Sequence, residues 1–304
     1  MMASHLVIKI GNQITMAKIL VTGATGRLGN AVLRSLVQKI PASEVVAMAR
    51  DTEKARPLAE LGVEVRYGDY TDYDSLVAAF RGVEKIYLVS AVAFSDRIGQ
   101  HQNAITAASR AGVRHVVYTS IQRINDELAP IEGVTESDIA TEQLLVKSGL
   151  TYTIIQHPLY ADDLPFLIGA NAAKEDFCAP VGKGRASFAT YAELAEAGAS
   201  LLTQTGYENR TCLLNAGQTW SFQEIADGLA LLTGKAISYQ AISVEAFIAA
   251  REAEGWPTAV AKFLSGWGNA IDKGAFDQSS HALERLLGRK PKSLHEMLRK
   301  VYSL

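Results

Sequence analysis

Short apolar runs alternate with helical segments over the first half of the chain. The runs are rich in Val, Ile and Tyr and carry few charges, as strands buried on both faces of a sheet do. They are Ile19–Thr22, Val45–Ala49, Val63–Tyr67, Ile86–Val89, Val113–Thr119 and Tyr152–Gln156. Helices are predicted between them over Leu28–Ile40, Thr52–Leu61, Tyr73–Phe80, Arg97–Ala111 and Ser137–Ser148. This alternation predicts an α/β fold with a doubly wound parallel sheet of the Rossmann type.

The alternation loosens after Gln156. A helix over Tyr191–Gln204 and a strand over Thr211–Asn215 are still expected, and the pattern from Trp220 onward is mostly helical. Two capping-box patterns, Ser221 with Glu224 and Ser293 with Glu296, each open an apolar helix. We therefore predict a Rossmann domain over 16–157 and about 186–216. We predict a smaller, mainly helical lobe over about 158–185 and 217–304, lying over the C-terminal edge of the sheet.

Composition narrows the possible partners and surroundings. The chain has 304 residues and a net charge of -2, so no overall field favours nucleic acid or a membrane surface. No apolar stretch approaches the ~18 residues that span a bilayer. Cys178 and Cys212 build neither a disulfide framework nor a zinc site, so we expect a cytoplasmic protein without a metal. Residues 1–15 lack the features of a secretion signal, and we expect them to be an extension, with Met16 beginning the folded domain.

A glycine-rich turn follows the first predicted strand. Gly23, Gly26 and Gly29 lie between an apolar strand and an apolar helix. In a dinucleotide site, the first glycine of such a turn allows it to be tight. The second lets the backbone approach a pyrophosphate, and the third lets helix and strand pack closely. The helix N-terminus then offers N–H groups and a positive dipole end to the phosphates. The alternative is a glycine turn without a ligand. The turn lacks the Lys-Ser/Thr ending of a P-loop, so it does not predict hydrolysis of ATP or GTP.

The end of the second strand indicates which dinucleotide binds. An enzyme that uses NAD normally has an acidic residue there, whereas this strand ends at Arg50, which can grip a 2′-phosphate. Lys54, expected one turn into the next helix, would add a second charge. Asp51 follows immediately and keeps NAD open as an alternative cofactor. The alternative interpretation of Arg50 is a solvated arginine at a strand end. We predict a preference for NADPH.

The proton donor of many dehydrogenases with this sheet is missing. They use a Tyr-x-x-x-Lys pair, and no tyrosine here has a lysine four residues later. The sequence also lacks a nucleophile elbow and a zinc helix. Carbonyl reduction needs such a donor. An electron-poor conjugated acceptor, such as a quinone or cationic dye, accepts hydride, and where a proton is also needed it can come from solvent.

Several segments together resemble one family. The loop TGATGRLG, the second-strand segment VVAMARDTEKA, and the segments VEVRYGDYTD and IATEQLLVKSGLTYTII are similar to the NmrA-like family of atypical short-chain dehydrogenases. Within it, they are most similar to the type 2 NAD(P)H:quinone oxidoreductases and the bacterial triphenylmethane reductases. The resemblance covers nearly all of 17–300. It implies a flavin-independent enzyme that binds NADPH and reduces quinones or related compounds, although some relatives are non-enzymatic NADP sensors.

The resemblance also implies roles for individual residues. The cofactor contacts that it implies are Gly23, Thr25, Gly26, Arg27 and Leu28 in the loop, Arg50, Asp69 and Tyr70 after the third strand, Ser90 and Ala91 after the fourth, and Thr119 and Ser120 at the end of the fifth. Tyr160 matches an aromatic residue near the nicotinamide. For the polar residues, a strand-end cap or a turn is the alternative.

Two residues depart from the family pattern. Asp138 stands where quinone and dye reductases usually carry histidine and aromatic-alcohol reductases lysine. It is a catalytic candidate, with a helix cap shared with Thr135 as the alternative. His157, where relatives often have asparagine or proline, ends the sixth predicted strand. Its expected near-neutral pKa suits proton delivery or a hydrogen bond to a quinone oxygen; the alternative is a structural histidine.

The sequence thus predicts an NADPH-dependent reductase that transfers hydride to a small electron-poor substrate. The alternative is a non-catalytic redox sensor that binds NADP(H) and acts through a protein partner. The substrate is left open, as is whether the protein forms a homodimer.

Overall fold

The computed structural model describes residues 8–10, 13–15, 17–92 and 94–304. The chain divides into two compact units of three segments each. Unit 1 consists of Met1–Ser120, Ala140–Ile155 and Ala195–Cys212. Unit 2 consists of Ile121–Ile139, Gln156–Leu194 and Leu213–Leu304. The division into a cofactor domain and a substrate lobe stays a prediction, because it concerns function.

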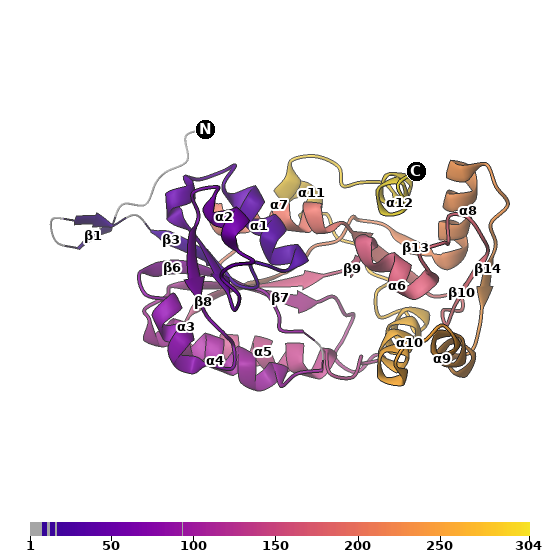
Figure 1. Cartoon of the computed structure of the whole chain (residues 1–304), viewed down its shortest axis with the longest axis horizontal. Coiled ribbons are helices and arrows are strands. Elements are labelled where there is room, and N and C mark those ends of the chain that lie inside the picture. Colours follow the sequence, from indigo (N-terminus) through magenta and orange to yellow (C-terminus); the bar gives the residue numbers. More distant parts are fainter. Residues whose placement is uncertain (1–7, 11–12, 16, 93) are drawn as a thin grey trace. The chain divides into compact units, whose positions relative to one another are not determined.

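The predicted α/β alternation is confirmed in unit 1 (Figure 1). Its main strands are β3 (Lys18–Val21), β4 (Val45–Ala49), β5 (Glu64–Tyr67), β6 (Val83–Leu88), β7 (His115–Ile121), β8 (Thr151–His157) and β12 (Arg210–Leu213). Its helices are α1 (Arg27–Leu36), η1 (Ala42–Glu44), α2 (Arg56–Ala59), α3 (Tyr73–Ala79), α4 (Arg97–Arg110), most of α5 (Thr135–Lys147) and most of α7 (Tyr191–Thr203). Several elements pass from one unit into the other because the chain alternates between them.

The central sheet has the strand order β12-β8-β7-β6-β3-β4-β5. Strand β3 pairs in parallel with β4 on one side and with β6 on the other, so Val21 lies between Ala47 and Tyr87. The order reverses at β3: the chain runs outward to β5 and returns to β6. In open α/β sheets, ligands bind at the carboxyl ends of the strands beside such a reversal. We therefore expect a ligand site at the residues that follow β3 and β6.

Helices cover both faces of the sheet, with α3 and α4 on one face and α1 and α2 on the other (Figure 1). The core under α3 and α4 includes Leu20, Phe80, Ile86 and Tyr118. One predicted helix is much shorter than expected. The sequence predicts a helix over Thr52–Leu61, but α2 begins only at Arg56, and the residues before it form a turn in which the Ala55 N–H donates to the Thr52 carbonyl at 3.2 Å.

Unit 2 is built mainly of helices, with short strands between them. Its helices are η2 (Ala161–Asp163), α6 (Leu164–Ile168), α8 (Phe222–Thr233), α9 (Val244–Ala253), α10 (Thr258–Asp272), α11 (Ala282–Leu287) and α12 (Leu294–Tyr302). Its strands are β9 (Leu159–Tyr160), β10 (Phe177–Ala179), β11 (Arg185–Ala189), β13 (Thr219–Ser221) and β14 (Tyr239–Ala241). Both predicted capping boxes are present, at Ser221 before α8 and at Ser293 before α12. Phe188, Phe222 and Phe276 lie in its core.

The N-terminal residues are only partly described. Strands β1 (Ile8–Ile10) and β2 (Gln13–Thr15) pair with each other in antiparallel fashion, whereas Met16, the predicted start of the folded domain, lies outside the described residues. Among the helices that are described, none has the length and apolar character needed to cross a membrane.

Candidate active site

The glycine turn after β3 leads into a helix end that no side chain caps. Gly23 has a φ of +59°, and its carbonyl accepts the Gly26 N–H at 2.9 Å, which closes the turn. Gly26 is the N-cap of α1, and the first turn of α1 carries no acidic residue. The first N–H groups of a helix have no acceptor within it. This end of α1 therefore suits an anion.

The turn leaves little space for a side chain at two of its glycines. A Cβ on Gly29 would lie 2.3 Å from the Gly23 oxygen, so helix and turn pack too closely for any side chain. A Cβ on Gly26 would lie 3.2 Å from the same oxygen, on a residue that is exposed. Thr25 and Arg27 are also exposed, while the Leu28 side chain is buried, which leaves only its backbone for a cofactor. These features fit the diphosphate of a dinucleotide.

Arg50 and Lys54 differ in their availability to a 2′-phosphate. Arg50 is exposed directly after β4, and no hydrogen bond or ion pair engages it within the described part of the chain. The Lys54 ammonium lies 3.6 Å from Asp51 Oδ2, and its residue precedes α2 instead of lying inside it. The expected position of Lys54 within a helix is therefore wrong, and Arg50 is the better placed cation.

Tyr70 links the carboxyl ends of three strands. Its hydroxyl lies 2.5 Å from Thr22 Oγ1 and 2.7 Å from the Val89 carbonyl oxygen. Thr22 Oγ1 in turn accepts the Val89 N–H at 2.9 Å. Burial raises the pKa of Tyr70 well above its usual range, so the hydroxyl stays protonated. The Asp69 carboxylate accepts bonds from the Thr71 N–H and hydroxyl and shapes the turn beside it.

A buried histidine holds the segment after β6, and sequence analysis missed it. His101 Nε2 accepts the Ala91 N–H at 2.8 Å, so the proton of the ring is on Nδ1, 2.7 Å from Thr141 Oγ1. Burial lowers the pKa of His101 to about 3, which keeps the ring neutral. The Ser90 N–H donates to Thr119 Oγ1 at 2.9 Å. Both predicted residues after β6 are thus fixed through their backbone.

Ser120, near the end of β7, donates its hydroxyl to Glu142 of α5. The Thr119 and Ser120 side chains are both buried and occupied in contacts between elements. The predicted cofactor residues all lie in unit 1, and those that follow β3 and β6 flank the reversal of strand order. Their roles toward a cofactor stay predictions.

His157 and Tyr160, in unit 2, contact each other at the end of β8. His157 Nδ1 lies 3.0 Å from the Tyr160 hydroxyl, and the two rings meet edge to face at 5.8 Å. The expected near-neutral pKa of His157 is wrong: the residue is 2% exposed, and burial lowers its pKa to about 3. Its Nε2 has no hydrogen-bond partner among the residues that the structure describes. A neutral imidazole of this kind takes part in hydrogen bonds but does not deliver a proton at neutral pH.

Asp138 lies in the first turn of α5 and is 2% exposed. A carboxylate there interacts favourably with the helix dipole. Thr135 Oγ1, the expected partner in a helix cap, accepts the Ile131 N–H at 2.9 Å. Asp138 belongs to unit 2, as do His157 and Tyr160.

Comparison with known proteins identifies relatives over nearly the whole chain. The model of the NmrA-like family matches residues 15–298. Quinone oxidoreductase 2 of Escherichia coli K12 is 34% identical over 288 residues, which are 94% of this chain and 99% of that protein. The crystal structure of the E. coli NADPH-dependent quinone oxidoreductase QOR2 with NADPH has a TM-score of 0.87 at 33% identity and covers 93% of this chain and 99% of that one. The Citrobacter sp. triphenylmethane reductase with NADP(H) has a TM-score of 0.87 at 35% identity, with coverage of 93% and 99%.

Proposed function

The chain belongs to the NmrA-like family, and from this membership and the geometry of unit 1 we propose that it is an NADPH-dependent, flavin-independent reductase of quinones or related electron-poor conjugated compounds. The observation that carries the proposal is the uncapped end of α1 after β3, together with the exposed Arg50 after the neighbouring strand β4. Phosphate groups bind well at such a helix end, and a guanidinium distinguishes NADPH from NADH.

Unit 1 binds and orients the cofactor. The N–H groups of the glycine turn and of the first turn of α1 would hold the diphosphate, and Arg50 would hold the 2′-phosphate. The Ser90 and Ala91 N–H groups donate to Thr119 Oγ1 and His101 Nε2, and these bonds keep the chain after β6 rigid where the ribose and nicotinamide would rest. When bound, NADPH supplies the hydride.

His157 and Tyr160 are proposed to contact the acceptor. A quinone that gains a hydride and one proton becomes a hydroquinone. Because His157 is neutral and weakly basic, we assign it a hydrogen-bonding role and assign the proton to solvent. Holding the acceptor flat and close contributes by proximity and orientation. Asp138, the third candidate, is tested by Asp138→Asn. An unchanged turnover number would mean that Asp138 takes no part in the reaction.

Binding and turnover are measured separately. Thermal unfolding with NADPH and with NADH tests the cofactor, and NADPH oxidation is then followed across quinones, triphenylmethane dyes and enones. Steady oxidation with a quinone supports the reductase. Tight NADP(H) binding with no turnover on any acceptor supports the redox sensor instead, and no thermal shift contradicts both. His157→Ala with unchanged turnover would remove His157 from the mechanism.

We also propose that the protein acts in the cytoplasm. Cys178 and Cys212 form no disulfide in the described part of the chain, as expected in a reducing compartment. A homodimer is a further proposal, which sedimentation of the purified protein tests.

A further inference from the structure

Tyr160 is held from two sides by one short stretch of chain. In the backbone, β9 pairs in parallel with β11, which places Tyr160 opposite Ala189. Two residues after Ala189, α7 begins at Tyr191, whose ring stacks on the Tyr160 ring at 4.3 Å between centroids and 26° between planes. The stretch that leads from β11 into α7 therefore fixes both the main chain and the ring of Tyr160.

Hydrogen bonds hold Tyr191 at its backbone N–H and at its ring hydroxyl. Its hydroxyl donates to Asp163 Oδ2 at 2.8 Å, and its N–H donates to Asp162 Oδ2 at 2.9 Å. The other oxygen of Asp162 forms an ion pair with Lys300 of α12 at 3.1 Å. These bonds hold the main chain and the hydroxyl of Tyr191, whereas the contact with Tyr160 is made by the stacked ring itself.

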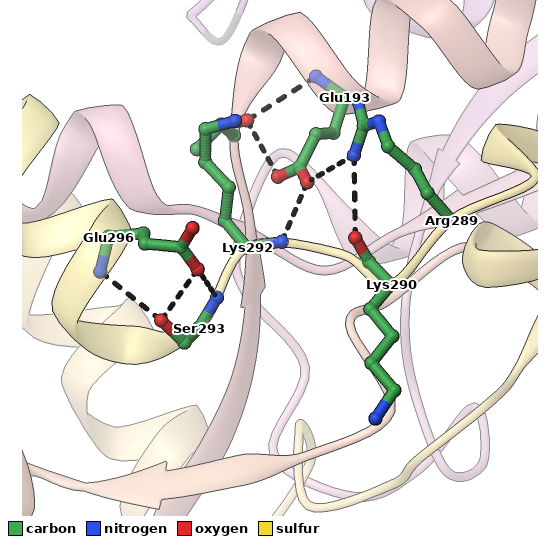
Figure 2. Close-up of polar contacts among 7 residues, drawn as sticks. Glu193, Arg289, Lys290, Lys292, Ser293 and Glu296 are labelled. Carbon is green, nitrogen blue, oxygen red and sulfur yellow. Dashed lines mark hydrogen bonds and ion pairs between the residues drawn. The ribbon is translucent and has the colours of Figure 1, made fainter.

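The first turn of α7 is anchored a second time through Glu193, as Figure 2 shows. The Thr190 hydroxyl donates to Glu193 Oε2 at 2.9 Å, and Glu193 Oε1 accepts the Lys292 N–H at 2.7 Å. Arg289 lies 3.3 Å from the same oxygen, and the Glu193 side chain is 1% exposed. These contacts hold the backbone of the turn and do not involve the stacked rings.

We propose that Tyr191 is a positioning residue for the reduction, acting through Tyr160 on His157. The inference rests on the proposed function, which gives Tyr160 and His157 their contact with the acceptor. The chain of contacts is continuous: Tyr191 stacks on Tyr160, and the Tyr160 hydroxyl lies 3.0 Å from His157 Nδ1. A stacked partner fixes ring orientation, and small misplacements of reacting groups cost about two orders of magnitude in rate.

The test compares two substitutions that keep apolar bulk at position 191. Tyr191→Leu removes the stacked ring, and Tyr191→Phe keeps it while losing the bond to Asp163. Glu193→Gln is the matched control, because it weakens the anchor of the same turn without touching Tyr160. For each, kcat and KM are measured with a quinone, the NADPH dissociation constant by titration, and the thermal midpoint by calorimetry. Nitrogen NMR of 15N-histidine-labelled protein, with the His157 signal assigned through His157→Gln, reports on the imidazole without needing turnover.

We expect Tyr191→Leu to lower kcat tenfold or more and to shift the His157 signal, with the NADPH dissociation constant unchanged. Tyr191→Phe should stay within about twofold of the parent protein in kcat. Glu193→Gln should lower the thermal midpoint and leave kcat and the His157 signal in place. Equal losses for Leu and Phe, or a Leu variant with normal kcat and signal, would overturn the inference.

If the parent protein reduces no acceptor, the proposed function fails. The inference is then judged by NMR alone: a His157 signal that moves in Tyr191→Leu but not in Tyr191→Phe supports the positioning contact, and a signal that moves in neither overturns it.

Discussion

Replacing Arg50 by alanine tests the cofactor assignment most directly. Arg50 is exposed after β4 and has no ion pair to break within the described residues, so its guanidinium is available to a 2′-phosphate at little cost. A hydrogen bond to a charged group contributes about 1.5–3 kcal/mol. Its loss should raise the NADPH dissociation constant about 10- to 150-fold. NADH lacks the 2′-phosphate, and its dissociation constant should not change.

Lys54→Ala is the matched control. The Lys54 ammonium is already paired with Asp51 at 3.6 Å, and its side chain is 75% exposed, so solvent screens it. We expect its substitution to change the NADPH dissociation constant less than about fivefold, corresponding to less than about 1 kcal/mol.

The dissociation constants of NADPH and NADH are measured by fluorescence or calorimetric titration. All titrations use one fixed salt concentration, because salt screens the interaction between Arg50 and a 2′-phosphate. Two results would refute the reasoning. One is a parent protein that binds NADPH and NADH equally well. The other is an Arg50→Ala variant that loses affinity for both by the same factor, because Arg50 would then act on the shared part of the two cofactors.

Three further predictions concern stability. Gly29→Ala should lower the free energy of unfolding by about 1–3 kcal/mol and abolish the thermal shift with NADPH, because its Cβ would meet the Gly23 oxygen at 2.3 Å; Gly266→Ala inside α10, whose Cβ would meet nothing nearer than 4.0 Å, should be neutral or stabilising. Stability should fall as the pH drops from about 6.5 toward 4, because the unfolded chain protonates imidazoles that the fold keeps neutral, with pKa values of about 3 for His101 and about 4 for His115. Urea titrations at several pH values should show a smaller loss for His101→Gln, and an equal loss would contradict the assignment. Ser221→Ala breaks a capping box and should cost about 0.5–2 kcal/mol in calorimetry, whereas a loss near zero would mean that Ser221 does not limit the stability of α8.

The sheet was predictable because buried parallel strands are continuous apolar runs. Val45–Ala49 is predicted and observed with the same bounds, and both capping boxes appear where their spacing indicates. Strand β10, by contrast, has three residues and owes its existence to pairing with β14, some sixty residues later in the chain. The pattern of neighbouring residues does not predict such a strand.

The candidate site likewise includes residues that could be predicted from the sequence and residues that could not. The glycine turn and Arg50 are recognisable because their chemistry depends on neighbours in the sequence. His101 and Tyr191 act through residues that the fold brings together, such as Thr141 and Tyr160. Position at a strand end suggested an accessible His157, but burial cannot be inferred from position, and it changed the role that the imidazole can play.

The interleaving of the two units has a consequence for synthesis on the ribosome. Strand β12 at the edge of the central sheet lies beyond Ala195, after two long segments that belong to unit 2. A nascent chain that stops before β12 leaves β8 as an unpaired edge, the kind of surface that joins other chains. Premature termination products of this protein should therefore need chaperones or aggregate. Because each unit consists of three separate segments, neither unit can be expressed as one uninterrupted fragment.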